Sequence, residues 1–235
     1  QGLPLHLTQD FRVPADVTLT VAAGSVVKLP EGVQFEVDGT IQAVGTIDQP
    51  IVFTALTDDS AGGDSNGDLS TTMPVPGSWD AMWLDSSSSQ LNHVQFRYGG
   101  NRVSPNNASW RTPALHVRGD VSPTVENVSI VDAENQGLYV SGGTTTFTNL
   151  SIERVGSDAI YLEAAANPTF VGLETSGNSI DRVFINGLSV LREDRTWDSN
   201  GLPIHLGRDI RIDSDATLTL VPGTVVKLPN GVQFE

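Results

Sequence analysis

Apolar and polar residues alternate in short triplets that recur at nearly constant spacing along the chain. In each triplet, two apolar residues flank a central residue that varies from lysine to tryptophan. Leu138-Tyr139-Val140 is a clear example, and Ile160-Tyr161-Leu162 repeats it 22 residues later. We align ten such triplets, at residues 5–7, 27–29, 51–53, 82–84, 115–117, 138–140, 160–162, 183–185, 204–206 and 226–228. Because alternate residues of a strand point to opposite faces, each triplet predicts a strand with one buried and one open face.

A period near 22 residues predicts a solenoid, and it is too short for a pair of helices. The triplets are rich in β-branched and aromatic residues and are bounded by turn formers, so we expect an all-β parallel β-helix in which each coil adds about 4.8 Å. The 23 glycines and 13 prolines suit this turn-rich fold. Asn127 and Asn149 recur at one point of neighbouring coils, which favours either an inward ladder of amide hydrogen bonds at a turn or a left-handed turn conformation.

A second repeat is much longer. Residues 2–36 and 201–235 are identical at 22 of 35 positions, at a constant offset of 199. We therefore expect residues 1–200 to form one unit of eight coils, about 38 Å long, and residues 201–235 to begin the next tandem unit of the same solenoid. A fortuitous internal duplication is the alternative. Lys28 and Lys227 occupy equivalent positions of the two copies, and we expect both to face solvent.

Charge and composition exclude several classes of partner. The formal net charge is −15 and the sequence contains no dense basic cluster, so neither nucleic acid nor an anionic membrane is an expected partner. The chain has no cysteine, which excludes disulfides and thiol chemistry. No apolar run approaches the length of a membrane span, so we expect no membrane insertion in this segment.

Residues 56–80 interrupt the period and predict a projecting acidic loop. Four of its side chains carry oxygens at short spacing, namely Asp59, Asp64, Asn66 and Asp68. Carboxylate and amide oxygens in alternation are typical of the start of calcium loops, which favours a structural Ca²⁺ ion. The helix–loop–helix pattern is incomplete, because the glycine comes one place early and no glutamate occupies the twelfth position. A solvated acidic loop without metal is the alternative.

The open faces of the later triplets predict a ladder of rings, formed by Trp83, His116, Tyr139, Tyr161, Phe184 and His205. A second projecting loop, residues 97–113, adds Trp110. Three explanations stay open for these residues: stacking between strands that stabilises the sheet, lateral contact with a further copy of the protein, and binding of a polysaccharide.

The sequence predicts no catalytic residues. Asp80, Asp85 and Arg97 could be assembled into a Ca²⁺-dependent site that cleaves polysaccharide, but nothing in their spacing requires it. Tandem copies of one unit favour a mechanical or adhesive role over catalysis.

Several motifs within residues 24–100 are specific. They read GSVVKLPEGVQFEVDGT, DDSAGGDSNGD, GSW and RYGG. This stretch resembles the bacterial secreted and cell-surface proteins built from right-handed parallel β-helix repeats. The resemblance implies an extracellular stalk, adhesin or matrix component without a defined reaction. We therefore expect a structural or adhesive segment of a long fibre whose partners are further copies of itself.

Overall fold

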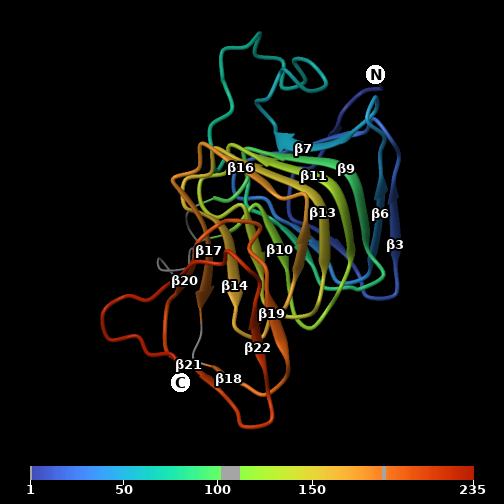
Figure 1. The fold of residues 1–235 in the computed structure, drawn as a ribbon. Helices are drawn as coiled ribbons and strands as arrows, with labels where there is room; N and C mark the ends of the chain where they lie inside the picture. Colours follow the sequence, from blue (N-terminus) through green and yellow to red (C-terminus); the bar gives the residue numbers. More distant parts are fainter. Residues whose placement is uncertain (1, 102–111, 187–188) are drawn as a thin grey trace.

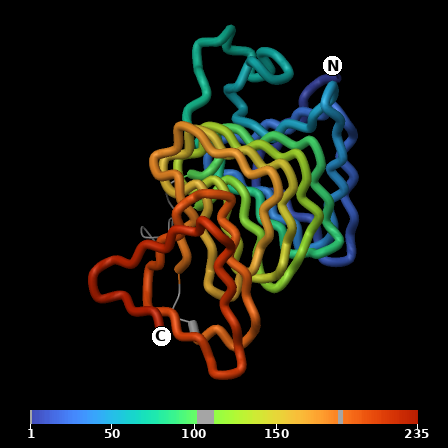
Figure 2. Tube along the Cα trace, viewed as in Figure 1, coloured from blue at the N-terminus to red at the C-terminus, as the bar shows by residue number. Residues whose placement is uncertain are grey.

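The computed structural model describes residues 2–101, 112–186 and 189–235, and these residues form an all-β solenoid (Figure 1). Parallel strands stack in about nine turns of roughly 23 residues each, which confirms the predicted parallel β-helix. The coils follow the sequence from one end of the stack to the other (Figure 2). Within the described ranges the chain forms no helix, and so none that could cross a membrane.

Two large sheets make up most of each coil. The nine-stranded sheet has the order β2 (Phe11–Val13), β5 (Phe35–Val37), β8 (Met82–Leu84), β10 (Leu115–Val117), β12 (Leu138–Val140), β14 (Asp158–Glu163), β17 (Ile180–Asn186), β20 (Ile204–Leu206) and β23 (Val226–Lys227). The ten-stranded sheet runs through β1 (Leu5–His6), β4 (Val26–Leu29), β7 (Ile51–Ala55), β9 (Gln90–Arg97), β11 (Thr124–Val131), β13 (Thr146–Glu153) and β15 (Thr169–Val171), and it also includes β3 (Thr18–Val21), β6 (Thr40–Val44) and β16 (Glu174–Ser176). Near the C-terminal end, β18 (Ser189–Leu191) pairs with β21 (Ile210–Ile212), and β19 (Arg195–Trp197) pairs with β22 (Leu218–Leu220).

The core fills the space that the coils enclose. The flanking residues of the triplets point inward, and Met82 and Leu84 have no exposed surface. Aromatic rings pack within this core: Phe35 meets Phe53 edge to face with centroids 5.4 Å apart, and Phe53 stacks on Phe96 at 5.5 Å. Burial of each large apolar side chain stabilises the fold by about 1.5–3 kcal/mol, so the stack is held mainly by this continuous core.

The register of the first coils differs from the predicted one. From Met82 onward, seven triplets lie in the nine-stranded sheet as expected, but the triplets at 5–7, 27–29 and 51–53 lie in the ten-stranded sheet. Both sheets carry an apolar residue at every second position, so spacing alone cannot assign a triplet to one of them. The projecting loop also makes this change of sheet hard to detect in the sequence. It lengthens the coil between Glu36 and its partner Trp83 to 47 residues.

The two 35-residue copies keep the same local structure in different surroundings. Leu5 pairs with Val27, and Ile204 pairs with Val226 in the same way. The amide of Gln34 donates to Asp10 at 3.1 Å, as that of Gln233 does to Asp209 at 2.8 Å. However, the first copy starts in the ten-stranded sheet and the second in the nine-stranded sheet. The offset of 199 residues therefore does not return the chain to the same face.

The recurring asparagines combine a ladder with a left-handed turn, but the ladder does not face inward as predicted, because Asn127 is partly exposed and Asn149 is exposed. Asn127 and Asn149 are left-handed, with φ of 51° and 52°. Their amides also form a ladder, in which Asn149 donates to Asn127 and Asn127 donates to Asn92, each at 2.9 Å. Asparagine tolerates the left-handed conformation, and the ladder satisfies its side chain at the bend.

Candidate functional site

The predicted loop over residues 56–80 projects from the stack directly after β7 (Figure 1). Its base is fixed by Asp58, which is buried and accepts hydrogen bonds from the hydroxyls of Thr54 and Ser60, each at 2.6 Å. A guanidinium nitrogen of Arg97 lies 3.4 Å from the same carboxylate. The loop therefore leaves the solenoid from a charged and fully hydrogen-bonded anchor.

Lys28 lies beneath this loop, so the prediction that it faces solvent is wrong. Its side chain has no exposed surface, and its ammonium group donates to the carbonyl oxygen of Gly63 at 2.7 Å. Burial lowers the pKa of Lys28, and the nearby charges of Asp59, Asp58 and Asp64 oppose this shift. The residue is outward-facing on β4, as expected, but the loop folds back over it. Lys227 is exposed, as predicted.

The four predicted metal ligands come together in the loop. The carboxylates of Asp59, Asp64 and Asp68 offer oxygens that all lie within 4.8 Å of one another. The amide nitrogen of Asn66 lies 2.9 Å from an oxygen of Asp68. Among the described residues, buried side-chain oxygens of Asp59, Ser65 and Asn66 have no hydrogen-bond partner. Ser65 was not among the predicted ligands, and in the sequence its hydroxyl is marked only by its place between Asp64 and Asn66.

Hydrogen bonds within the loop hold two of these carboxylates. Asp64 accepts from the amides of Gly67 at 2.8 Å and Leu69 at 3.0 Å. Asp68 accepts from the hydroxyl and amide of Thr72, and the hydroxyl bond is the main cause that lowers the pKa of Asp68. At the acidic end of the loop, four carboxylates are set against two cations: Lys28 and Arg97 lie near Asp58, Asp59 or Asp64, and Asp68 is the fourth carboxylate. A net charge of −2 remains at the loop, which suits a divalent cation.

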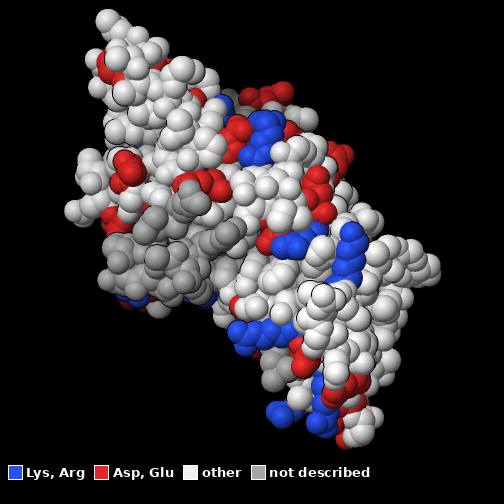
Figure 3. All heavy atoms as spheres, turned by 90° about the vertical axis from the view of Figure 1, so that its left-hand side faces the viewer, with Lys and Arg blue, Asp and Glu red and all other residues white. Residues whose placement is uncertain are grey.

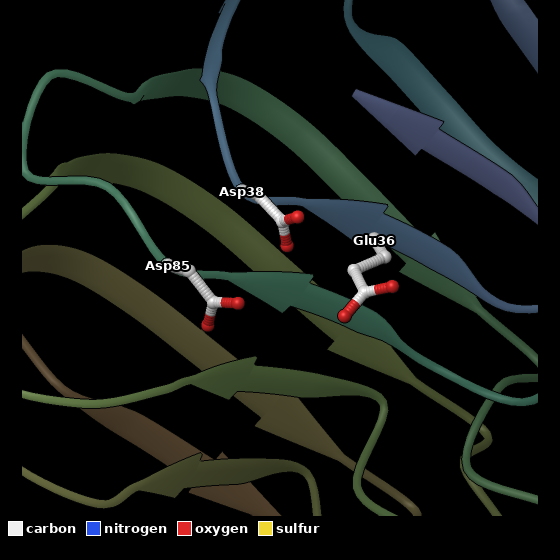
Figure 4. A group of neighbouring side chains, drawn as sticks. All are labelled: Glu36, Asp38 and Asp85. Carbon is white, nitrogen blue, oxygen red and sulfur yellow. The ribbon is translucent and has the colours of Figure 1, made fainter. Parts of the chain in front are cut away.

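A second carboxylate cluster lies on the outer face of the nine-stranded sheet and was not predicted. Glu36, Asp38 and Asp85 point toward one another (Figure 4), with oxygens within 4.8 Å. Arg118 closes the cluster: it donates to Asp85 and, at 2.7 Å, to Glu36, and these bonds raise the pKa of the guanidinium. Arg12 donates to Asp38 at 2.6 Å.

This second cluster is held by arginines rather than arranged around an open centre. The guanidinium of Arg118 also stacks on the ring of Trp83, with 4.6 Å from its carbon to the centroid. Because Asp85 pairs with Arg118 while Arg97 pairs with Asp58, two of the residues that we considered for catalysis belong to different ion-pair groups.

The predicted ladder of rings is present in register. His116 stacks on Tyr139 with centroids 4.2 Å apart, and Tyr139 meets Tyr161 at 4.9 Å. Tyr161 and Phe184 are 5.2 Å apart, whereas Trp83 is 6.5 Å from His116. His205 pairs with Phe184 in the same register. His116 and Tyr139 are buried, and the other four rings are partly exposed. Trp110, which we also predicted as a contact residue, lies outside the described residues.

Comparison with protein-family models, curated proteins and solved structures finds no match for this chain. Its function must be inferred from its own residues. On the face shown in Figure 3, charged groups of both signs are interleaved, and its described residues form no broad basic area.

His116 makes the stability of the ladder depend on pH. Burial, and secondarily the charge of Arg118, lowers the pKa of His116 from 6.5 to about 4. Between these two values the unfolded chain binds a proton that the folded chain does not. The contribution to stability is therefore complete above pH 6.5 and is lost as the pH falls toward 4, by about 3 kcal/mol in total.

This prediction is checked by urea unfolding at pH 7, 5.5 and 4. The variant His116→Phe keeps a ring against Tyr139 but cannot take up a proton, so its loss of stability over this range should be smaller than that of the parent chain. Equal losses in both proteins would show that carboxylates alone cause the acid sensitivity.

Proposed function

We propose that this chain is a structural segment of an extended, secreted or cell-surface β-helical protein, in which the stack continues onto further copies of the same unit. One observation carries the proposal. Val26 and Leu29 are 5% and 0% exposed, whereas their equivalents in the second copy, Val225 and Leu228, are 52% and 48% exposed. The second copy thus keeps core residues at positions that nothing covers.

The first copy explains what these residues are for. β7 pairs with β4 and covers it, and the register includes Val26 with Val52 and Leu29 with Ala55. The equivalent strand β23 lies last in its sheet. An open strand edge with exposed apolar side chains favours pairing with a further strand. The extracellular location and the role as stalk or adhesin rest on the sequence resemblance, and we propose no reaction.

A two-unit chain tests the proposal. It carries a second copy of residues 37–235 directly after Glu235, so that the repeat continues in phase. Small-angle scattering and electron microscopy should show one straight rod of about twice the length, melting in one transition above that of the single unit. The same chain with Leu228→Asp should bend or split at the junction, whereas Ile47→Asp, at an exposed apolar residue on a lateral turn, should change nothing. Two bodies on a flexible hinge would contradict the proposal.

We further propose that the projecting loop binds a structural calcium ion through Asp59, Asp64, Asn66 and Asp68. The unpaired buried oxygens of Asp59 and Asn66 favour this, because a buried oxygen without a donor is costly and a hard cation satisfies it. Extracellular calcium modules bind with Kd of about 10⁻⁴–10⁻³ M. At 10 mM Ca²⁺ the expected stabilisation is about 1.4–2.7 kcal/mol.

Thermal unfolding in Ca²⁺ and in chelator measures this effect. We expect Ca²⁺ to raise Tm by a few degrees and Mg²⁺ at equal concentration to raise it less. Asp64→Asn removes one charge but keeps an acceptor oxygen for Gly67, and water can replace the acceptor that the exposed Leu69 loses. The variant should therefore reduce the Ca²⁺ shift while leaving Tm in chelator nearly unchanged. An unchanged Tm on adding Ca²⁺ would remove the metal site.

A further inference from the structure

The chain contains only two lysines, and they occupy equivalent positions of the two 35-residue copies. Lys28 is fully buried under the acidic loop, whereas Lys227 is exposed. Each follows two valines on a strand that pairs with the first strand of its copy, since His6 pairs with Lys28 and His205 with Lys227. The same local structure therefore exists once with its cover and once without it.

Three residues of the first copy receive the loop. Lys28 donates to the carbonyl of Gly63. The neighbouring Gly62 lies against the other two: a Cβ atom built on it would be 3.1 Å from Cβ of Pro4 and 3.5 Å from Cγ1 of Val26. Gly62 also has a φ of +76°, which any L side chain adopts at a cost, so the loop approaches this surface through glycines.

The second copy keeps all three receiving residues unchanged, as Pro203, Val225 and Lys227. The backbone around them is hydrogen-bonded, because the amide of Ile204 donates to the carbonyl of Val225 at 2.8 Å. An ammonium group beside an apolar pair is a poor site for a free anion, which would leave the valine exposed. A glycine-rich acidic loop covers the apolar pair and offers both a carbonyl and carboxylates to the amine.

We infer that Pro203, Val225 and Lys227 form a preformed acceptor for another copy of the acidic loop, residues 58–64. This loop would belong to a further copy of the coil that begins at Val37. That coil would cover the second copy in the same way as the coil beginning at Val37 covers the first copy. The inference rests on the proposed continuation of the stack and adds to it a specific lock: each junction buries one lysine under the acidic loop of the next unit.

Amine acetylation of the two-unit chain, read by mass spectrometry, tests the lock. In the single unit, Lys227 should react at the rate of a free lysine and Lys28 at least tenfold more slowly. In the two-unit chain, Lys227 should slow at least tenfold, while the terminal copy of Lys227 stays fast and serves as an internal control. Replacing Asp58, Asp59 and Asp64 by serine in the second unit only should restore fast acetylation of Lys227.

The outcomes separate the lock from the stacking. A straight rod in which Lys227 still reacts fast would overturn the acceptor site and leave the proposed continuation of the stack intact. Slow labelling that persists in the serine variant would also overturn it, because coverage by the coil alone would then explain the protection. A flexible two-body chain with fast Lys227 would overturn both proposals.

Discussion

Replacing Lys28 by methionine is expected to lower the free energy of unfolding by about 1–3 kcal/mol, because it removes the donor of a hydrogen bond at the base of the loop. Methionine keeps the apolar stem, so packing against the loop changes little. The carbonyl of Gly63 loses its donor, and Asp59 and Asp64 lose a neighbouring positive charge. Lost attraction to the aspartates adds little to this cost, because burial outweighs that attraction in setting the pKa of Lys28 and because Gly63 and Asp64 are exposed and can rehydrate.

Lys227→Met is a matched control within the same molecule. It makes the same chemical change in a nearly identical sequence, but at an exposed side chain, so stability should change by no more than about 0.5 kcal/mol. Urea unfolding measures both variants, and limited proteolysis within residues 56–80 shows whether the loop detaches in Lys28→Met. Equal effects of the two substitutions would mean that the loop does not depend on the buried ammonium group.

Lys28 also shows where the sequence was insufficient. The alternation of the triplet placed this residue correctly on the outer face of its strand, and it placed Val27 and Leu29 correctly in the core. Whether an outer face meets water depends on how a loop of the next coil folds back. A loop that interrupts the period has no periodicity of its own, so this contact could not be predicted.

The two carboxylate clusters also differ in whether the sequence could predict them. Asp59, Asp64 and Asp68 could be predicted together because they belong to one short segment. Glu36, Asp85 and Arg118 come from three successive strands of one sheet, separated by long coils. Predicting that group requires the pairing register of the three strands. The insertion of residues 56–80 changes the spacing between these strands, so the register could not be counted from the sequence. The ladder from Trp83 to Phe184 was predicted because coils of nearly constant length separate most of its members.

Trp79→Ala is expected to destabilise the protein by about 3–5 kcal/mol, the usual cost of removing a fully buried tryptophan. The indole nitrogen donates to the carbonyl oxygen of Arg97 at 2.7 Å. The ring also lies against Gly99, where a Cβ atom would be only 2.9 Å from a ring carbon. Trp79 thus joins the end of the first projecting loop to the strand end of β9, where the second long coil leaves the sheet.

Trp79→Phe separates packing from hydrogen bonding at this junction. It keeps most of the buried apolar area but leaves the carbonyl of Arg97 without its donor, so we expect a loss of about 1–3 kcal/mol. Urea unfolding gives both values, and the accessibility of Lys28 to acetylation reports whether the loop stays closed. If Trp79→Ala lowers stability but Lys28 stays protected, then the anchor at Asp58 and Lys28 holds the loop without Trp79. If Lys28 is instead acetylated faster in Trp79→Ala than in the parent chain, then Trp79 is needed to hold the loop over Lys28.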